Sequence, residues 1–228
     1  MRRWSGRAAA AVTLLAAGAA LADPPTPAPA SPPAPPAAAL PAAPVGLALA
    51  VFPPKTALKL RVSSPAFADG ADIPFKNTQY EGNVFPGLRW GHGPYGTRSY
   101  VIIMQDADVN WHGGPLLHWS MYDIPAGGTH LDPGLVAPPI GASFGPNVRG
   151  PSNPYMGPHT PRGPKHHYHF AVLAVDVVVP VDPKLGYDAL AAAIQGHVLA
   201  SGEVVGLGQF DPNVPPPPAH PAPPPAGH

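Results

Sequence analysis

Acidic and histidine side chains recur at short spacing in the middle of this 228-residue chain. Asp106 and Asp108 are separated by one residue, and His118 follows ten residues after Asp108, directly before Trp119. A carboxylate that accepts a hydrogen bond from an imidazole fixes the ring in one tautomer and raises its pKa. A histidine held in this way can bind an anion. The structural alternative is that the acids cap a turn and that His118 packs in the core.

A second cluster of ring side chains reads His166-His167-Tyr168-His169-Phe170. On a strand, side chains two residues apart share a face, so His166, Tyr168 and Phe170 point one way and His167 and His169 the other. The first face can line a pocket. Two histidines at i and i+2 on the second face can chelate Cu²⁺ or Zn²⁺, with other histidines as further ligands. The alternative is that His167 and His169 are ordinary surface or hydrogen-bonded residues.

The segment Gly141–Gly145 matches the G-x-S-x-G pattern of many hydrolases, with Ser143 at its centre. That pattern exposes a nucleophile only when a strand precedes it and a helix follows it. Prolines at positions 138, 139 and 146 border the segment and disfavour both elements. We therefore expect Ser143 to be inert and the protein to be no enzyme.

The elements that must position these residues are mostly strands. Strand-like alternation or β-branched and aromatic runs occur at 58–62, 99–104, 117–122 and 167–179. Only residues 187–201 have helical spacing, with Asp188 near the start and Leu190, Ile194 and Val198 on one face. The pattern predicts a β-rich, mixed α/β domain. Its 40-residue connection at 126–165 has the length of a functional loop.

The first 22 residues have the composition of an export signal. Three arginines precede the mostly apolar run Ala8–Leu21, and Ala20 and Ala22 supply the small residues of a cleavage site. The run has about 14 residues, fewer than the roughly 20 of a membrane-spanning helix, so a retained anchor is the weaker alternative. Because the chain has no Cys, it cannot be a lipoprotein. We expect an exported protein, periplasmic or secreted.

Proline marks the boundaries of the folded part. Residues 1–55 hold 12 of the 38 prolines and residues 213–228 hold 8. We interpret residues 23–55 as an Ala/Pro-rich linker, 56–212 as one folded domain and 213–228 as a Pro-rich tail. The apolar residues of Val45–Phe52 are the part of the linker able to lie against the domain.

Charge excludes some partners. The chain has 13 Lys and Arg against 13 Asp and Glu, and charged residues make up 11% of it. Nucleic-acid binding needs a basic surface, which this composition does not supply. The sequence after the signal has no polybasic stretch or basic amphipathic helix, so we expect no stable membrane anchor.

Seven segments, in order, resemble the phosphatidylethanolamine-binding protein family, and in particular its bacterial Raf kinase inhibitor-like branch. They are VSSPAFADGADIPFKNT (62–78), LRW (88–90), QDAD (105–108), LLHWSMYDIP (116–125), FGPNVRGPSNPYMGP (144–158), PRGPKHHYHF (161–170) and AAIQGHVLASGEVVG (192–206). The resemblance implies a large central β-sheet flanked by a smaller sheet and a few helices. It also implies one cavity for phosphate-like anions or phospholipid head groups.

Carried over by position, the resemblance implies a pocket of seven ligand-binding residues: Asp106, Asp108, His118, Gly157, Pro158, His166 and Tyr168. His118, His166 and Tyr168 would donate hydrogen bonds to the anion, and Asp106 would orient a histidine. Gly157 lets backbone approach a ligand, and the acids would keep both histidines partly protonated. The chain departs from the family at Ala107, Asn110, His159-Thr160 and His167, which alters the rim of the pocket.

The preferred function is therefore an exported binding protein for a small anion or phosphorylated head group, without a cofactor. Inhibition or regulation of another protein is a further role that the resemblance allows. The alternative function is an envelope metal-binding protein that uses the histidine clusters.

Overall fold

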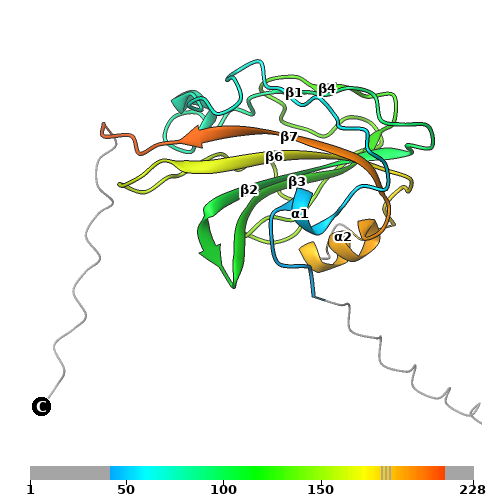
Figure 1. Cartoon of the computed structure of the whole chain (residues 1–228). Coiled ribbons are helices and arrows are strands. Elements are labelled where there is room, and N and C mark those ends of the chain that lie inside the picture. Colours follow the sequence, from blue (N-terminus) through cyan, green and yellow to red (C-terminus); the bar gives the residue numbers. More distant parts are fainter. Residues whose placement is uncertain (1–41, 181, 183, 185, 214–228) are drawn as a thin grey trace, which may run out of the picture. The chain divides into compact units, whose positions relative to one another are not determined.

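The computed structural model describes residues 42–180, 182, 184 and 186–213. Its centre is a five-stranded antiparallel sheet with the order β5-β3-β2-β6-β7 (Figure 1). The strands are β2 (Ser99–Trp111), β3 (Gly114–Pro125), β5 (Ser143–Phe144), β6 (His166–Val175) and β7 (Val198–Gly208). The expected signal peptide at 1–22 and all but the first residue of the expected tail lie outside the described residues.

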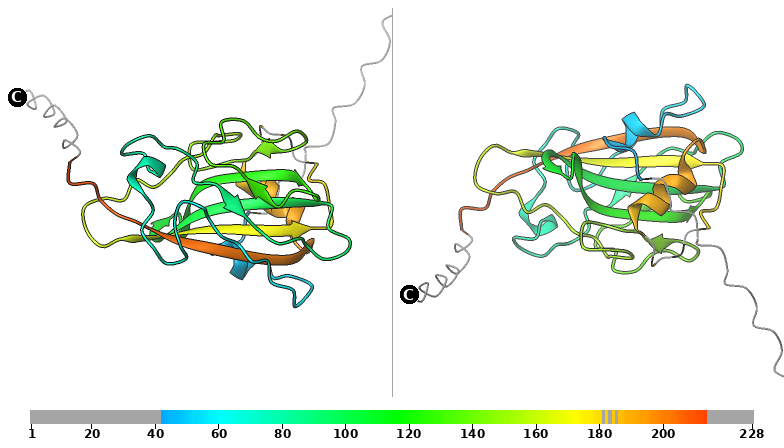
Figure 2. Two further views of the ribbon diagram at one scale, coloured as in Figure 1. Left: turned by 90° about the horizontal axis from the view of Figure 1, so that it is seen from above. Right: turned by 90° about the horizontal axis from the view of Figure 1, so that it is seen from below.

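Both faces of this sheet are covered. The short strands β1 (Leu88–Arg89) and β4 (His130–Leu131) pair on one side, together with the 3₁₀ helix η1 (Phe75–Asn77). The helices α1 (Ala48–Val51) and α2 (Tyr187–Ile194) lie on the other side (Figures 1 and 2). In the described part of the chain, no helix has the length and apolar character that crossing a membrane requires. The expected β-rich architecture with a smaller sheet and few helices is confirmed.

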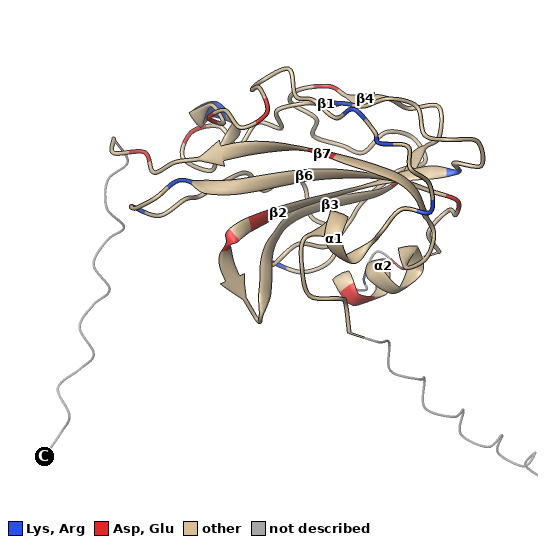
Figure 3. Cartoon of the chain, viewed as in Figure 1, with Lys and Arg blue, Asp and Glu red and all other residues tan. Residues whose placement is uncertain are grey.

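Alternate residues of β2 supply two separate cores. Tyr100 and Ile102 pack in the cluster under the small sheet, while Val101 and Ile103 pack in the cluster under the helices. A strand buried on both faces reads as an unbroken apolar run, which is why residues 99–104 are recognisable as a strand. Charged residues are few and dispersed, most of them in loops and near the ends of elements (Figure 3).

Two elements differ from the expectations. The helix expected at 187–201 ends at Ile194, and the chain from Val198 onward is the edge strand β7. Gly196, with φ of 76°, makes the turn between them, and pairing with β6 then outweighs the apparent helical spacing. Residues 58–62 form no strand but only an isolated bridge from Lys59 to Ser201.

The expected linker also ends earlier than residue 55. Ala48 and Phe52 are each 1% exposed and belong to the core on the helix side of the sheet. The buried Gln105 of β2 accepts a hydrogen bond from the Ala48 backbone N–H at 2.8 Å. The Ala43 N–H donates to Asp188 Oδ1 at 2.7 Å. The apolar part of the linker, Val45–Phe52, thus lies against the domain, as its composition allowed, and residues 43–52 are not a free spacer.

Candidate functional site

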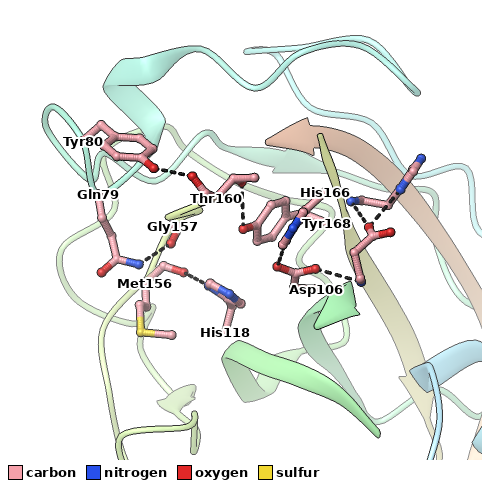
Figure 4. A network of polar contacts seen from close by, with 11 residues as sticks. Gln79, Tyr80, Asp106, His118, Met156, Gly157, Thr160, His166 and Tyr168 are labelled. Atoms are coloured by element: carbon pink, nitrogen blue, oxygen red, sulfur yellow. Dashed lines mark hydrogen bonds and ion pairs between the residues drawn. The ribbon is translucent and has the colours of Figure 1, made fainter. Parts of the chain in front are cut away.

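Three adjacent strands bring the acidic and histidine motifs to one end of the sheet. Asp106 of β2 lies opposite Tyr168 of β6, and β3 runs along the other side of β2 with Leu116 opposite Asp106. His118 lies two residues further along β3. Figure 4 shows that Asp106, His118, His166 and Tyr168 come together beside the loop that carries Gly157.

Asp106 and His166 form the most buried ion pair of the described residues. Asp106 Oδ2 and His166 Nδ1 are 2.8 Å apart, with the side chains 2% and 13% exposed. The other carboxylate oxygen accepts the Asp108 backbone N–H at 2.9 Å. Because a carboxylate only accepts, Nδ1 of His166 carries the proton and Nε2 is the nitrogen left for a ligand. Asp106 thus orients His166, as the resemblance implied.

His118 is buried and stacks edge-on against Tyr168, with ring centroids 5.0 Å apart. Its Nδ1 donates to the Met156 carbonyl oxygen at 3.2 Å, and the Gly157 backbone is a further hydrogen-bond partner of the ring. Burial lowers the pKa of His118 and outweighs the Asp106 carboxylate, which acts to raise it. The expectation that nearby acids keep His118 partly protonated was therefore wrong: desolvation of the charged ring dominates.

Tyr168 supplies a hydroxyl at the same place. Its oxygen lies 3.2 Å from Thr160 Oγ1, and burial raises the pKa of the phenol, so the hydroxyl stays protonated and able to donate. Tyr80 in turn donates to the Thr160 carbonyl oxygen, which ties the loop after Pro158 to the segment after η1.

Gly157 and Pro158 form a loop held by side chains from the segment after η1. The Gly157 N–H donates to Asn83 Oδ1 at 2.8 Å, and its carbonyl oxygen accepts Gln79 Nε2 at 2.7 Å. The Gln79 N–H donates to the Pro158 carbonyl oxygen at 2.9 Å. A Cβ at position 157 would collide with the Asn77 carbonyl oxygen. Glycine is thus required for contact with this segment, and its expected role in letting a ligand approach stays a prediction.

Asp108 lies apart from the other predicted residues. Its Oδ2 accepts the His167 backbone N–H at 2.6 Å and lies 3.0 Å from His167 Nδ1. Burial acts to raise the pKa of Asp108, but the hydrogen bonds from His167 act against it. The net effect is a pKa below the ordinary value of an aspartate. The side chains of this pair are 39% and 53% exposed. The Asp108 backbone N–H thus donates to Asp106, whereas the Asp108 carboxylate bonds to His167 on the opposite face of β6.

The two histidines considered as metal ligands have different partners. His167 pairs with Asp108, whereas His169 Nδ1 lies 3.0 Å from Glu203 Oε2 of β7. Across the residues that the structure describes, no group of three or more His, Cys, Asp or Glu side chains is arranged to hold a metal ion. Among the described residues, the metal-binding alternative therefore has no cluster of ligands in its favour.

Ser143 does not occupy a nucleophile elbow. It lies in β5, where it pairs with Tyr122 of β3, and the next described strand or helix along the chain is β6. Gly145 then donates its N–H to the Ser120 carbonyl oxygen. The strand-turn-helix geometry of the hydrolase motif is absent from this part of the structure.

Sequence reasoning missed the residues that hold the site from a distance. Gln79 and Asn83 anchor Gly157, and Arg149 Nη2 donates to Gln79 Oε1 at 2.9 Å. Thr160 was noted only as part of an altered rim. These contacts join segments about 70 residues apart, so no short spacing in the sequence indicates them.

Comparisons with known proteins agree with this fold. The family model described as phosphatidylethanolamine-binding protein matches residues 63–209. A UPF0098 protein of Chlamydia pneumoniae is 33% identical over 150 residues, which cover 64% of this chain and 97% of that protein. LppC of Mycobacterium tuberculosis, provisionally named a lipoprotein, is 33% identical over 164 residues, covering 71% and 77%. The crystal structure of E. coli YbcL, described as a new member of the mammalian PEBP family, matches with a TM-score of 0.62 and 25% identity, covering 68% of this chain and all of YbcL.

Proposed function

Because the chain belongs to the phosphatidylethanolamine-binding protein family, we propose that it binds a small phosphate-like anion or phosphorylated head group. The binding groups are His118, His166 and Tyr168, with Asp106 as the residue that positions His166. The observation that carries the proposal is the 2.8 Å contact between Asp106 and His166 at a buried strand pair.

The proposed chemistry follows from the hydrogen bonds that the two histidine rings already make. Nδ1 of His118 is bonded to Met156, and Nδ1 of His166 is bonded to Asp106. Protonation at Nε2 would turn each ring into a cationic donor toward an anionic oxygen, and such charge-assisted bonds are about twice as strong as neutral ones. Anion binding is therefore coupled to proton uptake, and affinity should rise as pH falls.

The finer parts of the function stay predictions. Export, to a periplasmic or secreted location, is supported by the arginines and apolar run of residues 1–22. Regulation of another protein and the absence of catalysis rest on the family resemblance and on the inert setting of Ser143. Each needs its own experiment.

NMR titration of the full chain with inorganic phosphate and with phosphoethanolamine tests the anion site. We expect His118→Ala or His166→Ala to weaken binding about tenfold to a hundredfold, because each loses one charge-assisted hydrogen bond. His166→Gln, which keeps a donor for Asp106, serves as the second variant if His166→Ala does not fold.

His167→Ala is the matched control, because His167 lies next in sequence but points to the opposite face. The affinity of His167→Ala for phosphate and phosphoethanolamine should stay within about twofold of the wild-type value. Equal losses in the control and the site variants, or no loss in the site variants, would reject the site.

A further inference from the structure

Arg149 brings a guanidinium to the rim of the proposed anion site. Its Nη2 donates to Gln79 Oε1 at 2.9 Å, and the amide nitrogen of the same Gln79 donates to the Gly157 carbonyl oxygen at 2.7 Å. The Arg149 backbone N–H donates to Asn147 Oδ1 at 2.8 Å. The residue before Gly157 is Met156, which accepts the hydrogen bond of His118. One chain of contacts thus links the guanidinium to the backbone segment that also bonds to the buried histidine.

This cation has no counter-charge in the described part of the chain. No described carboxylate lies within ion-pair distance of Arg149, and Gln79 accepts from only one of its guanidinium nitrogens. A guanidinium carries five N–H donors, so others remain for a ligand. The charge of Arg149 also disfavours protonation of His118, because the two cations would repel each other. An anion bound between them would offset this repulsion.

The two carboxylates near the site are already paired. The Asp106 carboxylate bonds to His166, and the Asp108 carboxylate bonds to His167 on the opposite face. Burial lowers the pKa of His118 and so disfavours its charged form. Arg149 therefore supplies the permanent positive charge of the rim, since a guanidinium stays protonated at every ordinary pH.

We propose that Arg149 is the fixed cation of the anion site and makes it select doubly charged phosphomonoesters over singly charged phosphodiesters of the same head group. This inference rests on the proposed function, since it assumes that the anion binds at His118. A phosphomonoester carries nearly two negative charges above its second pKa of about 6, whereas a diester carries one. Attraction to a fixed cation grows with that charge, and the planar guanidinium fork matches two phosphate oxygens.

Calorimetric titration of the full chain at pH 7.5 tests this selectivity, with phosphoethanolamine as the monoester and glycerophosphoethanolamine as the diester. We expect the wild type to bind the monoester about tenfold more tightly. Arg149→Gln should lose about tenfold for the monoester and about threefold for the diester, so the preference shrinks about threefold. Arg98→Gln removes an exposed arginine just before β2 and should change neither affinity.

A second measurement needs no ligand. In an NMR pH titration of the His118 ring, the pKa should be higher in Arg149→Gln than in the wild type and unchanged in Arg98→Gln. Because Arg149 is exposed, both variants should keep the wild-type thermal midpoint.

The outcomes separate the two proposals. If the wild type binds neither ester, the proposed function and this inference both fail. If His118→Ala abolishes binding while Arg149→Gln keeps the full monoester preference, the anion site stands and the role of Arg149 is wrong. An unchanged His118 pKa in Arg149→Gln would also overturn that role.

Discussion

Asp106 and His166 are 60 residues apart in the sequence, yet their side chains meet with Oδ2 and Nδ1 2.8 Å apart. The antiparallel pairing of β2 with β6 brings them together, because Asp106 lies opposite Tyr168 and His166 lies two residues away on the same face of β6. The sheet register therefore builds the pair, and the pair fixes the orientation of the His166 ring.

Removing the Asp106 carboxylate should destabilise the fold. In Asp106→Ala, the Asp108 N–H and His166 Nδ1 lose their common acceptor at a part-buried place, and each lost hydrogen bond to the charged carboxylate costs about 1.5 kcal/mol. Urea denaturation at pH 7 should show a loss of at least about 2 kcal/mol in the free energy of unfolding. Asp108→Ala, which removes a half-exposed partner, should lose less than about 1 kcal/mol. Equal losses in the two variants would contradict the orienting role of Asp106.

The low pKa of His118 should appear in the pH dependence of stability. Because its folded-state pKa lies below the unfolded value of about 6.5, the unfolded chain takes up a proton first as the pH falls. This residue therefore contributes a loss of stability below about pH 6.5 and no change above it. In phosphate-free buffer, the urea midpoint of His118→Gln should fall less between pH 7.5 and 5.5 than that of the wild type. The same fall in both proteins would show that His118 does not titrate as its burial implies.

The segment before residue 56 should be part of the cooperative unit. Phe52 is 1% exposed in the core beneath α1 and α2, so Phe52→Ala should cost about 3–5 kcal/mol. Val45→Ala, at a side chain 67% exposed, should cost less than about 0.5 kcal/mol. Thermal denaturation of both variants measures the difference. If Phe52→Ala kept wild-type stability, this segment would belong to the linker and not to the cooperative unit.

The sequence was informative where one local pattern determined the structure. Strands β2 and β6 were predictable from β-branched and aromatic runs, and the two-residue period correctly placed His166 and Tyr168 on one face. Strand β7 was mistaken for the end of a helix because it is rich in small residues. It is a strand because β6 offers a partner along its length.

The residues that hold the site in place could not be predicted, because no local sequence pattern indicates them. Gln79, Asn83 and Arg149 act through contacts with residues about 70 positions away, which follow from how the loops fold back over the sheet. The lowered pKa of His118 also depends on its depth in the protein, whereas the sequence shows only that acids precede it.

The central claim is that an anion binds between His118, His166 and Tyr168. The most direct measurement is a crystal structure of the protein grown without phosphate or sulfate and then soaked in phosphoethanolamine at a concentration that saturates binding in solution. We expect difference density for a phosphoryl group within hydrogen-bond distance of His118 Nε2, His166 Nε2 and the Tyr168 hydroxyl. Density for the ligand at another place only, or none at this site, would contradict it.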